Sequence, residues 1–377
     1  MEIYMKVIAA IDSFKGSMTS MEAGNAVKKG ILAAKPDAEV VVNPLADGGE
    51  GTVDALIEGL GAKKIPVTVA GPLGEKVSCY YGFLEETKTA VMEMASAAGI
   101  TLVTKKDPLR ASTYGVGEMI ADALKRGCKN FIIGIGGSAT NDGGIGMLKA
   151  LGFEFFDEDG NDVGEGAAAL AKIEVIQTEN KNPLLSGAKF QIACDVKNPL
   201  CGKQGATYIF GPQKGVTEEQ KSKVDEAMKH YADVTKESLG CDFADCEGAG
   251  AAGGLGYAFL SYLAGELIPG VELILQATGL EEKMKNADVV VTGEGRLDAQ
   301  TVMGKAPVGV AALAKKYNAK VIAFAGSVAP EASVCNQAGI DAFFPIVRGV
   351  TTLEEAMKKE NAMENIAATA EQVFRLL

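Results

Sequence analysis

The chain has 377 residues, of which 47% are hydrophobic, and a formal net charge of −12. This length suggests two domains, and an acidic chain without a basic run argues against nucleic acid and anionic membrane as partners. No stretch approaches the ~18 apolar residues of a membrane span. Seven cysteines without a C-x-x-C pair favour reduced thiols and a cytoplasmic protein. The single histidine, His230, excludes a Ser-His-Asp triad, a Cys-His pair and a multi-histidine zinc site.

The N-terminal third alternates apolar runs with helical patterns. Residues 7–11, 39–43 and 64–69 are predicted strands, and Thr19 with Glu22 forms a capping box that starts a helix ending before Pro36. This βαβαβ order predicts a parallel sheet covered by helices.

The middle of the chain has a different pattern. Residues 78–83 and 88–94 are predicted to form an antiparallel pair, and later strands are expected at 131–133 and 190–194. From residue 287 the alternation of strand and helix returns. We therefore predict an α/β fold in which both chain ends, 1–71 plus 286–377, form one parallel domain, and residues 72–285 form an inserted α/β domain.

A glycine-dense loop, Gly134 to Gly144, follows the strand at 131–133 and precedes a helix expected from Ile145. Backbone N–H groups of such a loop, beside a helix N-terminus capped by Asn141 or Asp142, can bind phosphate. Two other interpretations stay open. Gly134, Gly136 and Ala139 match the G-x-G-x-x-A dinucleotide fingerprint, and the loop can also be a tight turn without a ligand. A second glycine-rich segment, 248–256, is equally consistent with close helix packing and with ligand contact.

Charged residues follow several predicted strands. Phosphoryl transfer needs cations around phosphates, carboxylates for Mg²⁺ and a carboxylate that orients a hydroxyl, and this set supplies all three. Gly304-Lys305 is not a Walker A motif, since Ala299 and Ala306 stand where glycine and Ser or Thr are required. The residues concerned are Asp12, Lys15, Asp47, Glu50, Asp195, Glu294, Arg296, Asp298 and Lys305.

Taken together, these motifs resemble the type 1 bacterial glycerate kinase family. The matching segments occur in order along nearly the whole chain: 11–17, 43–52, 134–144, 194–200, 210–215, 248–256, 292–301 and 304–305. The resemblance implies ATP- and Mg²⁺-dependent phosphorylation of D-glycerate, at the 2-hydroxyl, to give 2-phosphoglycerate in organic-acid (glycerate, glyoxylate or glucarate) catabolism. It also implies a Rossmann- or flavodoxin-like three-layer domain, a mixed-sheet second domain and a site in the cleft, in a monomer or homodimer.

The hypotheses for individual residues follow from that resemblance. Asp195 is the candidate base for the glycerate hydroxyl, while Arg296 and Lys15 are candidates for the substrate carboxylate or the transferred phosphate. Metal candidates, without an order among them, are Asp142, Glu294, Asp47 and Glu50. Substrate- and phosphate-binding candidates are Ser13, Asp47, Gly48, Gly49, Gly136, Gly137, Ser138, Asn141 and Lys305.

Two functions from other classes stay in view. A nucleotide-dependent dehydrogenase would use the fingerprint in the central loop, and NADH binding without ADP formation would favour it. A non-catalytic sensor of small acids would be stabilised by glycerate without turning over ATP.

Overall fold

The computed structural model describes residues 5–45 and 52–377, so the predicted site residues Asp47, Gly48, Gly49 and Glu50 lie outside the described residues. The chain divides into two compact units. Unit 1 comprises Met1–Asp47, Asp54–Gly61 and Val271–Leu377, and unit 2 comprises Gly48–Val53 and Ala62–Gly270. No helix of the described chain is long and apolar enough to cross a membrane.

Unit 1 is built on a parallel sheet of strand order β13-β12-β11-β1-β2. The central strands are nearly continuous apolar runs, as expected where helices cover both faces of a parallel sheet. Residues on both faces of β1, such as Val7 and Ile8, are fully buried. The strands are β1 (Lys6–Ile11), β2 (Glu39–Pro44), β11 (Val289–Leu297), β12 (Lys320–Val328) and β13 (Ala342–Pro345).

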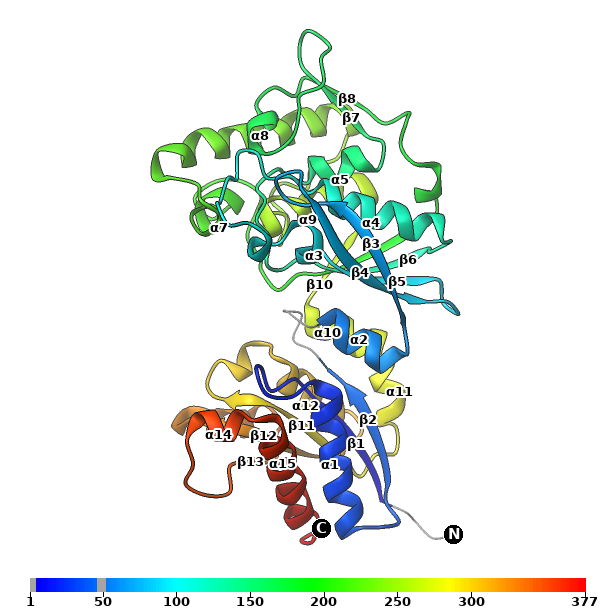
Figure 1. The fold of residues 1–377 in the computed structure, drawn as a ribbon, viewed down its shortest axis with the longest axis vertical. Helices are drawn as coiled ribbons and strands as arrows, with labels where there is room; N and C mark the ends of the chain where they lie inside the picture. The colour runs from blue at the N-terminus through cyan, green and yellow to red at the C-terminus, as the bar shows by residue number, and fades with distance from the viewer. Residues whose placement is uncertain (1–4, 46–51) are drawn as a thin grey trace. The chain divides into compact units, whose positions relative to one another are not determined.

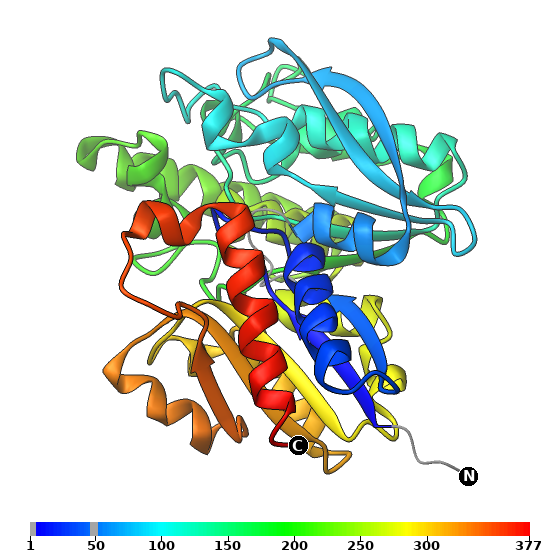
Figure 2. The same cartoon turned by 60° about the horizontal axis from the view of Figure 1, so that its bottom comes forward.

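Helices α1 (Ser20–Ala34) and α15 (Lys359–Phe374) lie side by side on one face of this sheet (Figures 1 and 2). They touch at Gly30, where a Cβ would stand 2.0 Å from the carbonyl oxygen of Ala367. Thr19 forms the predicted capping box with Glu22. Helix α12 (Ala306–Lys315) packs on β1, β11 and β12. The other helices that lie wholly or mostly in unit 1 are α2 (Thr52–Leu60), α10 (Gly270–Ala277), α11 (Leu280–Met284), α13 (Val334–Gln337) and α14 (Leu353–Met357).

Unit 2 contains a mixed sheet of strand order β10-β9-β6-β5-β4-β3. β5, β6, β9 and β10 run parallel, while β4 is antiparallel to both β3 and β5. A small antiparallel pair, β7 (Glu154–Phe156) and β8 (Val175–Gln177), lies outside it. The sheet strands are β3 (Lys63–Ala70), β4 (Lys76–Leu84), β5 (Thr89–Glu93), β6 (Asn130–Gly134), β9 (Lys189–Ala193) and β10 (Glu266–Ile268).

The helices of unit 2 pack on this sheet around a core rich in aromatic side chains. Phe131 and Phe190 of neighbouring strands stack at 4.7 Å, and Tyr231 meets Tyr257 edge to face at 5.5 Å. The helices are α3 (Ala95–Ala98), α4 (Tyr114–Lys125), α5 (Ile145–Ala150), α6 (Ala167–Leu170), α7 (Ala206–Lys214), α8 (Glu218–Leu239) and α9 (Leu255–Leu263).

These sheets confirm the predicted fold class, a parallel α/β unit from both chain ends and a mixed-sheet α/β unit between them. One strand was misplaced: the strand expected at 64–69 in the parallel sheet is β3, which pairs along its length with β4. The chain therefore leaves unit 1 near Gly61 and returns near Gly270, rather than at the expected 71 and 285. Independent folding of the two units as domains stays a prediction.

Candidate active site

Three strands of unit 2 end at the same level of the sheet. Glu93 of β5 pairs with Gly134 of β6, and Gly134 pairs with Ala193 of β9. Asp195 and Gly136 each lie two residues beyond this level on neighbouring parallel strands. In open α/β sheets this carboxyl edge is the usual place for ligands. The sheet thus brings the predicted base and the predicted phosphate loop together.

The central loop is exposed only at its tip. Gly136 and Gly137 are exposed, whereas residues 138–148 are buried. The carbonyl oxygen of Gly137 accepts from Ile100 at 2.8 Å, and the N–H of Ala139 donates to Ala98 at 2.9 Å. No acceptor among the described residues is recorded for the N–H groups of Gly136 and Gly137. Two adjacent N–H groups at an exposed tip can bind an anion.

The helix after this loop does not contribute as predicted. α5 starts at Ile145, as expected, but its cap is Gly144 in the left-handed region (φ 79°), and the start of the helix is buried. The prediction of Asn141 or Asp142 as N-cap is therefore wrong. The groups that this loop offers to an anion are therefore the N–H groups at its tip rather than the N-terminus of α5.

Asp142 is fully buried and its carboxylate is enclosed by protein donors. Oδ2 accepts from the backbone N–H and the hydroxyl of Thr113, both at 2.8 Å, and from Gly146 at 3.3 Å, while Oδ1 accepts from Gly144 at 3.1 Å. Burial raises the pKa of Asp142, and these donors oppose that shift. This geometry gives no support to Asp142 as a metal ligand. Asp142 instead connects the loop to Thr113 and to the start of α5 through these hydrogen bonds.

Two further loop residues predicted to bind phosphate are also buried. Ser138 is 6% exposed and Asn141 is not exposed at all. The Asn141 side-chain amide donates to the Thr207 hydroxyl at 3.0 Å, and its Oδ1 has no partner among the described residues. Asn141 therefore connects the loop to Thr207 inside the protein. Its side chain is not placed to contact a ligand at the exposed tip.

Asp195 is exposed just beyond β9. Its Oδ1 accepts a hydrogen bond from the backbone N–H of Gly270 at 2.8 Å, which orients the carboxylate. Glu93, which sequence reasoning missed, ends β5 on the other side of β6, and its Oε1 accepts from the N–H of Val53 at 3.2 Å. Unit 2 thus presents carboxylates and open N–H groups at one edge.

Unit 1 gathers its predicted residues at the carboxyl ends of β1 and β11. The N–H of Asp12 donates to the carbonyl oxygen of Gly293 at 2.9 Å, which places Asp12 next to Glu294. A Cβ on Gly295 would lie 3.9 Å from the backbone nitrogen of Lys15, so the segment after β1 lies against β11. Asp12 Oδ1 accepts from the N–H of Ser13 at 2.6 Å.

Glu294 is nearly buried and is held by two side chains. The Thr301 hydroxyl donates to its Oε1 at 2.7 Å, and Lys305 Nζ lies 3.2 Å from its Oε2. Burial raises the pKa of Glu294, while Thr301 and Lys305 lower it. Arg296 is 68% exposed, with its Nε 3.5 Å from Asp298 Oδ2. Thr301 was not among the predicted residues, because hydroxyl partners follow no spacing rule.

A metal centre made only of protein ligands is absent from the described residues. No group of three His, Cys, Asp or Glu side chains there could hold a metal ion. Mg²⁺ takes oxygen ligands and is usually held by one or two carboxylates together with substrate phosphates. Asp12 and Glu294, whose backbones lie side by side, are carboxylates of the type that this donor set needs.

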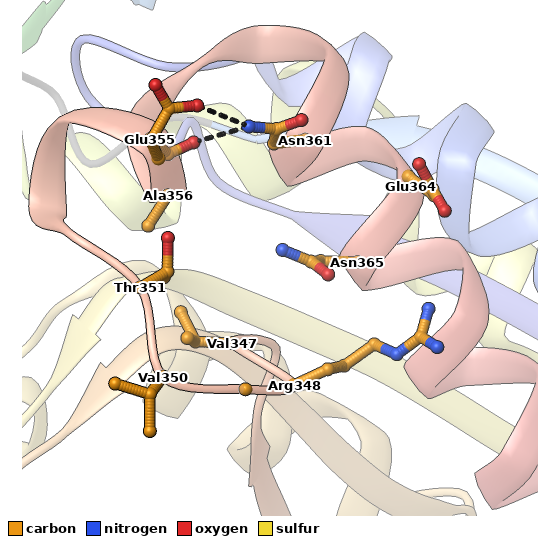
Figure 3. A pocket seen from close by; sticks show the side chains of 10 residues that line it. Val347, Arg348, Val350, Thr351, Glu355, Ala356, Asn361, Glu364 and Asn365 are labelled. Carbon is orange, nitrogen blue, oxygen red and sulfur yellow. Dashed lines mark hydrogen bonds between the residues drawn. The ribbon is translucent and has the colours of Figure 1, made fainter.

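A pocket of about 430 Å³ opens beyond β13 (Figure 3). Figure 3 shows Arg348 on the loop after β13 and Asn365 on α15 at its rim. None of the predicted site residues lines this pocket. Helix α14 above it does approach the segment after β1, because Met357 Cε lies 3.1 Å from where a Cβ of Gly16 would be.

Comparison with known proteins identifies the family. Residues 7–377 match the glycerate kinase family. The chain is 46% identical to "Glycerate kinase" of Bacillus subtilis (strain 168), over 98% of this chain and 97% of that one. It is 45% identical to "Glycerate 2-kinase" of Escherichia coli (strain K12), over 97% and 98%.

A solved structure supports the same assignment. The crystal structure described provisionally as glycerate kinase 2 from Salmonella typhimurium LT2 superimposes with a TM-score of 0.91 at 42% identity, covering 99% of this chain and 98% of that one. The predicted resemblance is confirmed. The chain belongs to the glycerate kinase family.

Proposed function

We propose that this chain transfers the γ-phosphoryl group of ATP to D-glycerate at its 2-hydroxyl and releases 2-phosphoglycerate and ADP. The observation that carries this proposal is the match over the full length of both chains to relatives named glycerate kinase and, in Escherichia coli, glycerate 2-kinase. The residues at the edges of both sheets supply the chemistry that such a transfer needs.

In unit 2, the loop tip and Asp195 have complementary roles. The N–H groups of Gly136 and Gly137 bind phosphate oxygens, and Asp195 orients the glycerate hydroxyl and accepts its proton as the oxygen attacks the γ-phosphorus. The bond from that phosphorus to ADP then breaks. A carboxylate suffices as base, because the loose transition state depends mainly on positioning and charge neutralisation.

In unit 1, the cations serve the anionic groups of the reactants. Arg296 and Lys15 are exposed, and an arginine fork matches a carboxylate geometrically. We assign Arg296 to the glycerate carboxylate and Lys15 to the transferred phosphate. Ser13 lies beside Asp12 at the same edge, and Lys305 is held by Glu294.

Mg²⁺ would be held by Asp12 and Glu294 together with phosphate oxygens, and would neutralise charge that develops on the phosphates. Thr301 and Lys305 keep Glu294 in place for that role. Asp47, Gly48, Gly49 and Glu50 stay predictions from the motif that carries them.

The dehydrogenase alternative receives no support from the loop geometry. A dinucleotide fingerprint requires the helix to open within the motif, but α5 begins only at Ile145, well beyond Ala139. We further propose a cytoplasmic monomer or homodimer in organic-acid catabolism. All seven cysteines are free, which is consistent with a reducing compartment.

A coupled assay with ATP, Mg²⁺ and D-glycerate tests the function, with ADP release as the signal and ³¹P NMR to identify the product. We expect glycerate-dependent ADP formation and the resonance of 2-phosphoglycerate. Formation of 3-phosphoglycerate would contradict the regiochemistry. Stabilisation by glycerate without ADP formation would favour the sensor instead.

A further inference from the structure

Helix α7 is attached to the central loop of unit 2 at two consecutive loop residues. At the C-terminal end of α7, Lys214 Nζ donates to the carbonyl oxygen of Thr140 at 2.7 Å. Near its N-terminal end, the Thr207 hydroxyl accepts from the side-chain amide of Asn141 at 3.0 Å. Thr140, Asn141, Thr207 and Lys214 are all buried, so water does not compete for these bonds.

Lys214 occupies an unusual place for a lysine. It is 2% exposed, and its Nζ donates to a backbone carbonyl oxygen, that of Thr140, rather than to a carboxylate. Burial lowers the pKa of Lys214 to about 7, and the charge of Asp142 opposes this shift. A buried amine destabilises the fold unless its donors are used. An apolar side chain of similar length would avoid that cost, so the packing of unit 2 alone does not require a lysine here.

The same stretch of loop is confined from another side. A Cβ on Gly253 would stand 2.1 Å from the Thr140 carbonyl oxygen, and the N–H of Gly143 donates to the carbonyl oxygen of Gly253 at 2.9 Å. Residues 140–143 are therefore in contact with both α7 and the 251–253 turn. This gives the glycines of 248–256 a packing role, one of the two interpretations open from the sequence.

The rigid part of the loop continues directly into its exposed tip. Ser138 and Ala139 are buried and lead from Thr140 to Gly137, whose positive φ of 74° sets the turn. The bond from Lys214 to the Thr140 carbonyl therefore holds the loop on one side of Ala139, while the backbone bonds of Ala139 to Ala98 and of Ile100 to Gly137 hold it nearer the tip. Together these contacts set the direction of the Gly136 and Gly137 N–H groups. Lys214 is too buried to touch a ligand at that tip.

We propose that Lys214, assisted by Thr207, is a positioning residue for phosphoryl transfer, which holds the loop so that the Gly136 and Gly137 N–H groups converge on the phosphates of ATP. This inference rests on the proposed function. It predicts that Lys214 affects ATP binding and the rate of the chemical step, and that it has little effect on glycerate binding.

The test compares Lys214→Met, which keeps the length and apolar stem, with Thr207→Val, which removes only the hydroxyl. Lys229→Met is the matched control, because Lys229 is an exposed lysine on α8 paired with Asp233. Steady-state kinetics for both substrates, the dissociation constant of ATP by calorimetry and Tm are measured for each protein.

We expect Lys214→Met to raise the KM and dissociation constant for ATP about tenfold, as for the loss of one buried hydrogen bond whose acceptor is left without its partner. Its kcat should fall and its KM for glycerate should stay within about twofold. Thr207→Val should show the same pattern more weakly, and Lys229→Met should match the wild type.

An unchanged ATP affinity in folded Lys214→Met would overturn the proposal, as would an equal rise of both KM values. If Lys214→Met does not fold, Thr207→Val decides by the same criteria. The wild-type assay distinguishes a failure of the proposed function from a failure of the proposed role of Lys214. Absence of glycerate turnover in the wild type contradicts the proposed function, whereas normal ATP affinity in the variants contradicts this inference alone.

Discussion

Gly134 of β6 and Ala193 of β9 are register partners in neighbouring parallel strands. Because both strands end at this level, the chain beyond each of them starts from the same edge of the sheet. Gly136 and Asp195 lie at equivalent positions past that edge. One pairing of two small residues thus brings the proposed phosphate loop and the proposed base together.

Replacement of Asp195 by Asn tests the base. The amide keeps the size of the side chain but cannot accept the hydroxyl proton, so kcat should fall by about 10²-fold or more with little change in KM for ATP. Rapid-quench or coupled kinetics measure both constants. A kcat near that of the wild type would remove Asp195 from this role.

Replacement of Gly136 by Ala tests the loop tip. A Cβ at this position meets nothing within 4 Å, so the variant should keep the wild-type Tm. The added methyl group lies where phosphates would approach the N–H groups, so KM for ATP should rise by about tenfold, the loss expected for one charged hydrogen bond. Normal ATP affinity in this variant would show that the tip does not bind phosphate.

Replacement of Gly253 by Ala tests the packing of the loop. The Cβ would lie 2.1 Å from the Thr140 carbonyl oxygen, and the φ of 70° adds strain, so we expect unfolding to become easier by about 2–5 kcal/mol. Gly160→Ala is the control, because Gly160 has a similar φ of 77° with nothing within 4 Å. It should lose only about 1 kcal/mol in urea unfolding. Equal losses in both variants would contradict the close contact.

Replacement of Arg296 by Lys tests the carboxylate site. Lysine keeps the charge but loses the planar fork, so KM for glycerate should rise by about tenfold while KM for ATP changes less. Arg375→Lys is the control, since Arg375 is also a surface arginine paired with an acid, Glu371. If Arg296→Lys leaves KM for glycerate unchanged, the carboxylate is bound elsewhere.

The pH dependence of stability tests the state of Lys214. Its pKa is lowered to about 7 by burial, so between about pH 7 and pH 10 the unfolded chain binds more protons than the folded one. This contribution makes the wild type more stable as pH rises through that window, and Lys214→Met lacks it. The Tm of the variant minus that of the wild type should therefore decrease from pH 7 to pH 9.

Asp142 should also make the Tm of Lys214→Met fall relative to that of the wild type as pH rises. It is the acid that faces Lys214, and loss of the lysine would raise the pKa of Asp142 further, which weakens the variant as pH rises. Scanning calorimetry across this pH range measures the difference. A difference that stays constant or grows with pH would show that Lys214 has an ordinary pKa.

Local sequence patterns predicted much of this structure. The apolar runs at 7–11, 131–133 and 190–194 form β1, β6 and β9, and the capping box at Thr19 starts α1. Strand ends and caps depend on near neighbours in the chain. For the same reason the order of residues alone makes those that follow apolar runs, such as Asp195 and Glu294, candidates for the site.

Patterns could not decide which sheet a strand joins. β3 follows a βαβ order that favours the parallel sheet, yet its backbone hydrogen bonds go to β4. An alternating run of residues fits either partner, because pairing depends on which strand edge lies open beside it. Because β3 belongs to the sheet of unit 2, the chain passes from unit 1 to unit 2 near Gly61 and not at residue 71, where the boundary was predicted.

Burial separated the site candidates from one another. In the central loop Gly136, Gly137, Ser138 and Asn141 were equal candidates to bind phosphate, but the structure leaves Gly136 and Gly137 exposed and buries Ser138 and Asn141. Lys214 and Thr301 lie in segments that match the family, but no role was predicted for them or for Thr207, since the partners they hold are distant in sequence or follow no fixed spacing.

The sequence by itself determined the family, the fold class and the edges at which reactive groups gather, because these follow from local apolar periodicity and from motifs read in order. Only the tertiary structure decided which polar side chains face a ligand and which hold the backbone in place. Both kinds use the same residue types. Their roles differ only through burial and through the partners that packing brings to them from remote parts of the chain.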